Sequence, residues 1–213
     1  MKKILSNRSI TRTEKEKQQI IKKAAKAYAK FMDALGFDWQ NDPNAAETPM
    51  RVAKAWVNDI ASGCFNEAPK ITAFENIDHY DGMVFQGNIK VHSLCAHHHI
   101  PFFGYAYVAY IPDKQGKVIG LSKINRIVNY YSRRPQVQEN LTMQIHDHIS
   151  KICEGNLGVA VYISAEHMCV KLRGVKHDST MKTSKLSGVF INDNVSCRYE
   201  FYNFIADLQR GRN

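Results

Sequence analysis

The sequence lacks any long apolar run. Its 213 residues are 44% hydrophobic, yet no apolar stretch approaches the roughly 18 residues that a membrane-spanning helix needs. The first residues, MKKILSNRSITRTEKEK, carry positive charge without an apolar segment behind them, which predicts that no secretory signal peptide is present. Internal repeats and low-complexity segments are also missing. We therefore expect a cytoplasmic protein with one or two domains.

The cysteines lack the even number and regular spacing of a disulfide framework. There are five of them, at irregular positions. Reduced thiols in a cytosolic protein are the simpler interpretation. A chain of this length buries a hydrophobic core without covalent cross-links.

Acidic residues are in the minority. The chain has 20 Asp and Glu against 29 Lys and Arg, a formal net charge of +9. This excess favours an anionic partner, which the charge alone does not distinguish as nucleic acid, a phosphorylated small molecule or an acidic surface. Part of the excess, KKAAKAYAK near the N-terminus, has the pattern of a solvated helix face.

Two helices are predicted in the N-terminal part. The first spans residues 13–35, with Thr13 as N-cap, Glu16 at the capping-box spacing and Gly36 after its end. The second lies within residues 47–63, with Thr48 as cap and Pro49 at the first helical position. The expected buried stripes are Ile20, Ala24, Tyr28, Met32 and Leu35 in the first helix and Val52, Trp56 and Ile60 in the second.

Beyond Asp81 the hydrophobic period changes to that of strands. The predicted strands span residues 83–94, 103–112 and 158–174, and the predicted helices span residues 122–134, 137–153 and 197–209. The expected buried helix residues are Leu141, Ile145, Ile149 and Ile152, followed by Tyr202, Ile205 and Leu208 in the last helix. The pattern predicts an α+β fold, with a helical region at residues 1–80 before a second domain at residues 81–213.

Cysteine and histidine gather at two places in the second domain. HSLCAHHHIP contains Cys95 and His98 at the spacing of half a zinc site. If residues 158–174 form one strand, alternate side chains share a face that begins apolar and ends with His167, Cys169, Lys171 and Arg173, like the floor of a pocket. The plain alternative for that strand is a buried cysteine beside a partly exposed histidine.

Together the two places offer Cys95, His98 and Cys169 as metal ligands. Three protein ligands leave a fourth tetrahedral position for water, as in catalytic zinc sites, although the spacing also allows His99 in place of His98. His97 and His167 would then lie beside the metal as groups that pass protons near neutral pH. The remaining cysteines, which have structural positions, are Cys64, Cys153 and Cys197.

Basic and polar residues elsewhere suit a phosphorylated purine. GLSKINR places Ser122, Lys123 and Arg126 where a strand leads into a helix, and a helix N-terminus with a nearby lysine binds phosphate. Further cations for a triphosphate are Arg51, Lys54 and Arg173. Gln138 and Glu139 in PQVQENL offer acceptors for the N–H edge of guanine, although a glutamate at a helix N-terminus is ordinarily only favoured by the helix dipole.

Five of these segments together resemble the GTP cyclohydrolase I family. They are ETPMRVAK, CAHHHIPFFG, VIGLSKINRIV, RPQVQENLT and AEHMCVKLRG, in this order over roughly residues 30 to 205. The resemblance implies an α+β tunnelling fold, an antiparallel sheet with helices on one face, preceded by a helical N-terminal region. It also implies a ring-shaped homo-oligomer, usually a decamer of two pentamers, with sites between neighbouring chains.

The resemblance also implies the site residues and the reaction. The zinc ligands fall on Cys95, His98 and Cys169, the proton-handling groups on His97, His167 and Ser122, the triphosphate contacts on Arg51, Lys54, Ser122, Lys123, Arg126 and Arg173, and purine recognition on Gln138 and Glu139. Zn²⁺ would activate water for attack on C8 of GTP. The guanine imidazole ring opens, formate is released and 7,8-dihydroneopterin triphosphate forms, the first step of tetrahydrofolate biosynthesis.

One position departs from the family pattern, and other functions compete. The family usually reads Cys-Glu-His-His, whereas Ala96 stands in place of the glutamate. The glutamate is not a metal ligand, so the departure concerns the groups that orient His97 or its loop. The alternatives are a zinc-stabilised nucleic-acid-binding module, which would need a fourth ligand, a related tunnelling-fold enzyme acting on pterins or deazapurines, and a member without activity.

Overall fold

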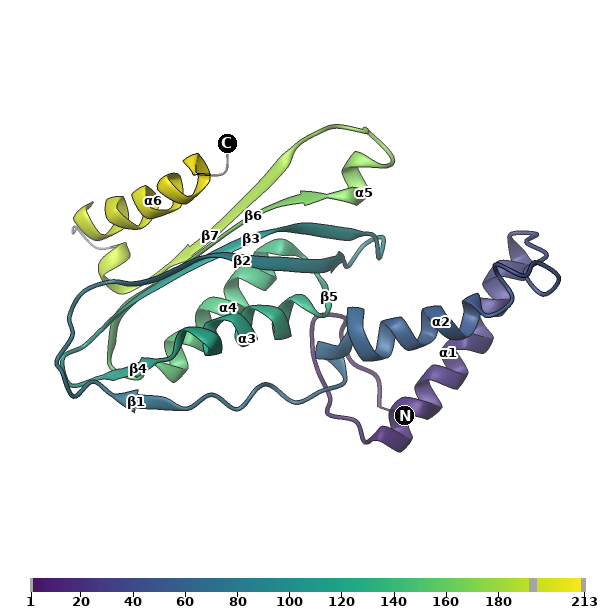
Figure 1. Ribbon diagram of the computed structural model, residues 1–213, viewed down its shortest axis with the longest axis horizontal. Coiled ribbons are helices and arrows are strands. Elements are labelled where there is room, and N and C mark those ends of the chain that lie inside the picture. The colour runs from purple at the N-terminus through teal and green to yellow at the C-terminus, as the bar shows by residue number, and fades with distance from the viewer. Residues whose placement is uncertain (1, 192–194, 212–213) are drawn as a thin grey trace. The chain divides into compact units, whose positions relative to one another are not determined.

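The computed structural model describes residues 2–191 and 195–211. The chain divides into two compact units, Met1–Glu67 and Ala68–Asn213, which are described separately (Figure 1). Residues 68–80, which the sequence pattern groups with the N-terminal region, belong to the second unit. Their strand β1 (Ala73–Glu75) pairs there with β4 (Lys117–Ile119). None of the helices in the described ranges has the length and apolarity that crossing a bilayer requires.

In the first unit, helix α1 (Glu14–Ala34) begins as predicted. The Thr13 hydroxyl accepts from the backbone N–H of Glu16, whose carboxylate accepts in return from the N–H of Thr13 at 2.8 Å. The expected stripe is only partly correct, because the buried residues are Ile21, Ala25 and Met32. Leu35 is wrong as a stripe residue, since it caps the C-terminus and is 53% exposed.

Helix α2 (Thr48–Ala55) starts one residue earlier than predicted. Its N-cap is Glu47, which places Thr48 inside the helix. The chain continues through the π-helical turn η1 (Trp56–Ile60) and the 3₁₀ turn η2 (Ser62–Cys64). The buried cluster between α1 and α2 consists of Ile21, Ala25, Ala53 and Val57. Each buried residue lies one position after the residue that the expected stripe named, for example Ala25 after Ala24 and Ala53 after Val52. The small side chains of Ala25 and Ala53 belong to the buried cluster.

The second unit contains a five-stranded sheet in the order β5-β2-β3-β6-β7. Its strands are β2 (Val84–Cys95), β3 (Pro101–Pro112), β5 (Pro135–Gln136), β6 (Asn156–His167) and β7 (Thr180–Leu186). All neighbours pair antiparallel except β2 and β5, which are parallel. The short β5 therefore ends beside the end of β2, and this pairing brings the next helix to the Cys95 end of the sheet.

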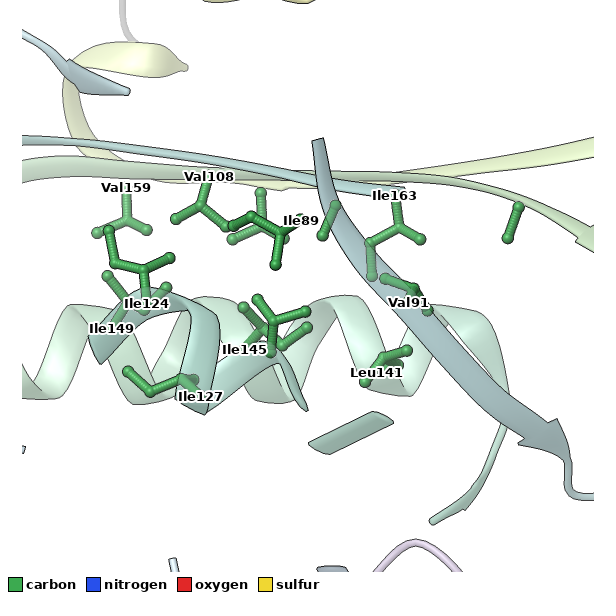
Figure 2. Packing of buried hydrophobic residues seen from close by; sticks show 14 of the residues in the cluster. Ile89, Val91, Val108, Ile124, Ile127, Leu141, Ile145, Ile149, Val159 and Ile163 are labelled. Carbon is green, nitrogen blue, oxygen red and sulfur yellow. The ribbon is translucent and has the colours of Figure 1, made fainter. Parts of the chain in front are cut away.

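Helices α3 (Leu121–Ser132) and α4 (Gln138–Ile152) cover one face of this sheet (Figure 1). Figure 2 shows strand side chains such as Val108, Val159 and Ile163 meeting Ile124 and Ile145 from the helices. The alternation of β6 confirms the predicted inward face, since Val159, Val161, Ile163 and Ala165 are all buried. This core fixes the ends of β2 and β6 relative to the start of α4.

The expectation of helices on one face only is wrong for this chain. Helix α6 (Val195–Arg210) packs over the other face, where Phe201 and Ile205 join Tyr107 and Ala109 in a second core cluster (Figure 1). Side chains of β3 alternate between the two clusters, which is why every residue from Ala106 to Pro112 is buried. Tyr202, predicted to point inward, is 37% exposed, and its neighbour Phe201 is fully buried instead.

The predicted strand over residues 158–174 is too long. Strand β6 ends at His167, and the short helix α5 (Met168–Lys171) follows. His167 pairs with Phe102, next to the first residue of β3, and β7 starts opposite Glu166. Beyond the level of His167, β7 has no residue and β3 has only Pro101, which has no N–H to donate. Cys169, Lys171 and Arg173 therefore do not continue the alternating face of β6.

Candidate metal centre and active site

The loop between β2 and β3 folds back on itself. The N–H of Cys95 donates to the carbonyl of Ile100 at 2.9 Å, and the N–H of His99 donates to the carbonyl of Cys95 at 2.8 Å. His99 takes a left-handed conformation with φ 55°. This tight turn places Nδ1 of His97 3.6 Å and Nδ1 of His98 3.9 Å from the sulfur of Cys95.

Cys169 completes a group of metal-binding side chains. Within the described residues, the ligand atoms of Cys95, His98 and Cys169 all lie within 4.8 Å of one another. Tetrahedral zinc with Zn–S and Zn–N bonds of about 2.3 and 2.0 Å requires ligand atoms roughly 3.6 Å apart, so small side-chain adjustments suffice. His98, and not His99, is the histidine grouped with the two sulfurs.

The donor set suits a borderline-soft divalent ion. Cys95 and Cys169 are 5% and 9% exposed, whereas His98 is exposed. Burial raises the pKa of the Cys169 thiol, and the hydrogen bond with Cys95 raises it further. Without a metal the Cys169 thiol is therefore favoured over the thiolate. A bound divalent cation favours the thiolate instead, because a coordinating thiol is deprotonated. Two thiolates and one imidazole favour zinc over oxygen-seeking ions.

His167 is held beside this group by a stack and a hydrogen bond. Its ring lies on Phe102, with centroids 4.5 Å apart and planes 8° from parallel. Its Nε2 lies 2.8 Å from Oε1 of Gln138. Burial lowers the pKa of His167, and the Glu139 carboxylate opposes this effect. The neutral imidazole is therefore the favoured form around pH 7.

The amide of Gln138 fixes which nitrogen of His167 carries the proton. Gln138 is 1% exposed, and its Nε2 faces the carbonyls of Ile163 and Met181 at 3.3 and 3.1 Å. Carbonyl groups only accept, so Oε1 must face His167 and accept from its Nε2–H. Nδ1 of the neutral ring then carries the lone pair.

Gln138 and Glu139, which were both predicted to bind the purine, have different surroundings. The side chain of Gln138 is engaged with His167 and the strands β6 and β7. Glu139 is exposed in the first turn of α4 and acts electrostatically on His167. The Gln138 carboxamide is therefore occupied, whereas the Glu139 carboxylate is accessible to a ligand.

Arg173 also lies at this end of the sheet. Its Nη1 is 2.8 Å from Nε2 of His98. The candidate metal ligands, His97, His167 and one cation thus come from two separate stretches of the second unit, residues 95–98 and 167–173.

Three predicted phosphate contacts lie at the opposite end of the sheet. Ser122, Lys123 and Arg126 occupy the first turns of α3, directly after β4, and Figure 1 shows β4 far from α5. The N–H of Ile119 donates to the Tyr110 hydroxyl, and Tyr110 pairs with Val159. Because a strand rises about 3.3 Å per residue, the segment from Val159 to His167 separates the two ends by roughly 25 Å.

Arg51 and Lys54 belong to the first unit. Both are exposed on α2, and Arg51 pairs with Glu47 at 2.7 Å. Their spacing on one helix agrees with a shared outward face.

Comparison with known proteins identifies the family of this chain. A family model described as GTP cyclohydrolase I matches residues 24–206. The chain belongs to the GTP cyclohydrolase I family.

Curated members of the family resemble the chain over most of its length. A GTP cyclohydrolase 1 from Sulfurihydrogenibium sp. is 45% identical over 184 residues, 86% of this chain and 94% of the relative. The Aeromonas salmonicida protein of the same name is 49% identical over 75% of this chain and 72% of its own. The one from Flavobacterium johnsoniae is 43% identical over 91% and 83%.

The family resemblance did not reveal every residue that shapes the site. Phe102, which stacks on His167, stands in the CAHHHIPFFG motif, where the sequence marks it only as an apolar strand residue. Its position opposite His167 follows from the register of β3 and β6, which no local pattern encodes. Outside the site, burial raises the pKa of Cys153 to about 12, in keeping with a structural role.

Proposed function

We propose that this chain is a GTP cyclohydrolase I. It opens the imidazole ring of GTP by hydrolysis, releases C8 as formate and forms 7,8-dihydroneopterin triphosphate. The observation that carries this proposal is the convergence of Cys95, His98 and Cys169 beside the oriented His167, in a chain that belongs to this family.

Cys95, His98 and Cys169 would hold one zinc ion per chain. Their distances and their two sulfurs support this choice. When bound, zinc supplies the Lewis acidity that activates water at neutral pH. Everything else in the reaction falls to side chains that hold the substrate and move protons.

His167 is the proposed proton donor to N7 of guanine. Its Nε2–H is committed to Gln138, so Nδ1, which carries the lone pair, would first accept the proton that the attacking water loses and then donate it to N7. The exposed Glu139 near it would accept hydrogen bonds from the N–H edge of guanine. His97 and Ser122 are proposed to move protons in the later steps, when the ribose opens and the pyrazine ring closes.

The triphosphate contacts support an oligomeric enzyme. The start of α3, which carries Ser122 and Lys123, lies at the end of the sheet that the length of β6 separates from His167 by roughly 25 Å, and Arg126 lies in the next turn of α3. That separation is too large for one GTP molecule to contact a triphosphate site and the metal centre within a single chain. We propose that a neighbouring chain supplies these residues, in a homo-oligomer that the family resemblance makes a decamer of two pentamers.

The direct test is incubation of the zinc-loaded protein with GTP. Formate should appear together with the absorbance and fluorescence of the oxidised pterin product. A zinc-loaded, assembled protein that produces neither formate nor pterin would rule out the proposed function.

The roles of His97 and His98 are separable. His98→Ala should lose zinc, because it removes a ligand from a three-ligand site. His97→Ala should keep zinc and turn GTP over at least about a hundredfold more slowly, since it removes a proton-transfer group. Metal analysis and turnover of both variants decide the matter. If His97→Ala loses zinc and His98→Ala keeps it, the two roles must be exchanged. Both outcomes are possible, because Nδ1 of each histidine lies at a similar distance from the Cys95 sulfur.

Gln138 should act as a positioning residue for His167. Gln138→Met removes the acceptor of the Nε2–H and should lower kcat by about ten- to a hundredfold while KM changes little. It should also lower the free energy of unfolding by about 1–3 kcal/mol, because buried partners are left unpaired.

The matched control for that change is Thr142→Val. Thr142 is buried in the same network, where its hydroxyl donates to the Gln138 carbonyl and lies 2.6 Å from the Thr183 hydroxyl rather than beside the His167 ring. It should lose stability without the drop in kcat. Equal effects of the two substitutions on kcat would reduce Gln138 to a purely structural role.

A further inference from the structure

Arg173 and His98 form a hydrogen bond with a defined direction. A guanidinium has only donors, so Nη1 of Arg173 donates and Nε2 of His98 accepts through its lone pair, at 2.8 Å. The neutral imidazole then carries its proton on Nδ1. That nitrogen faces the sulfur of Cys95 at 3.9 Å.

This hydrogen bond and coordination of a metal by His98 exclude each other. A neutral imidazole offers one in-plane lone pair. If the metal binds Nε2, it takes the lone pair that Arg173 uses. If the metal binds Nδ1, the proton moves to Nε2, and two donors then face each other. Repulsion between the cation and the guanidinium acts in the same direction.

We propose that a metal ion on His98 displaces Arg173 and so makes its guanidinium available to an anionic group bound at the same site. Metal and anion then bind with positive coupling. The inference rests on the proposed function, which makes zinc the metal and a triphosphate the anion. It implies that metal binding comes first and frees the Arg173 guanidinium, which then binds the substrate.

The surroundings of Arg173 permit this exchange. Every residue from 171 to 180 is exposed, so the guanidinium moves without repacking a core. Lys171, the nearest cation in the sequence, is already paired with Glu166 at 3.1 Å and Asp178 at 3.0 Å. Lys171 therefore serves as a matched control, because it is a neighbouring exposed cation that pairs with carboxylates and not with His98.

Coupling between two ligands is reciprocal. If Arg173 competes with the metal for His98, Arg173→Ala should bind Zn²⁺ about three- to tenfold more tightly than the original chain. This is the low range for a hydrogen bond with a charged donor, because both side chains are exposed. Lys171→Ala should bind Zn²⁺ with unchanged affinity. A chromophoric chelator competing for zinc at pH 8 measures these constants on the full assembled protein.

The second arm measures the anion. Tripolyphosphate is titrated calorimetrically into chelator-treated and zinc-loaded protein, and the zinc retained is determined after each titration. Zinc attracts the anion directly in every variant, so the informative quantity is the ratio of the two affinities. That ratio should be about three- to tenfold larger for the original chain and Lys171→Ala than for Arg173→Ala.

Two results would overturn the inference. One is zinc binding by Arg173→Ala that is no tighter than that of the original chain; the other is an equal ratio in all three proteins. Arg173→Gln guards against a folding defect, since its amide oxygen accepts the Nε2 proton and should likewise allow tighter zinc binding. No GTP turnover enters either arm, so failure of the coupling and failure of the proposed function are told apart.

Discussion

Cys95→Ser and Cys169→Ser should each abolish zinc binding and GTP turnover together. Both sulfurs belong to the proposed site of three protein ligands, in which the loss of one would leave two. A change in a group that merely supports a ligand costs roughly 10–100-fold in metal affinity, so loss of a ligand itself should cost more. Elemental analysis gives the zinc content per chain, and formate release gives the turnover.

Cys197→Ser is the control for this prediction. Cys197 is half-buried in α6 and packs beside the second core cluster, on the other face of the sheet from the cluster that contains Cys95. It should keep full zinc and full turnover. Full zinc in either Cys95→Ser or Cys169→Ser would refute the ligand assignment. Zinc lost equally from all three variants would point to a general effect on folding.

The parts of the fold that the sequence predicted are those set by local pattern. The capping box of Thr13 and Glu16 depends only on residues within one turn, and it formed as expected. The alternation from Val159 to Ala165 follows from strand geometry and was also confirmed. The end of β6 at His167 was missed, because it depends on where β3 and β7 start in space.

The same distinction applies to the site. Cys95, His98 and Cys169 were predicted because metal ligands have short characteristic spacings and because the family motifs were legible. The three ligand atoms lie close together as predicted, although Cys169 does not lie in strand β6 as expected. The helical turn of α5 brought it to the same place. The contact of Arg173 with His98 and the burial of Gln138 join residues far apart in the sequence, and no local pattern encodes them.

Mixing two inactive variants should restore activity if each site is shared between chains. Cys95→Ser lacks the metal half of the site, and a chain with Lys123→Ala and Arg126→Ala lacks the phosphate half. The two charged contacts contribute about 1.5–3 kcal/mol each, so the double variant should bind GTP at least about a hundredfold more weakly. Neither protein alone should turn GTP over at a useful rate.

Co-expressed at equal levels, the two variants should regain about a quarter of the original activity. In a symmetric oligomer with random mixing, each half of a given site is intact with a probability of about one half. Light scattering checks that the mixture forms assemblies of the original size, which the family resemblance sets near ten chains. An active monomer would contradict the shared site directly.

The decisive control mixes Cys95→Ser with Cys169→Ser. Both ligands come from one chain and lie within 4.8 Å of each other through their ligand atoms, so no exchange of neighbours rebuilds a complete metal centre. This mixture should stay inactive. If it recovers as well as the first mixture, recovery does not report shared sites. If the first mixture stays inactive in full-sized assemblies, Lys123 and Arg126 do not serve the metal centre of a neighbouring chain, and the proposal of a shared site is refuted.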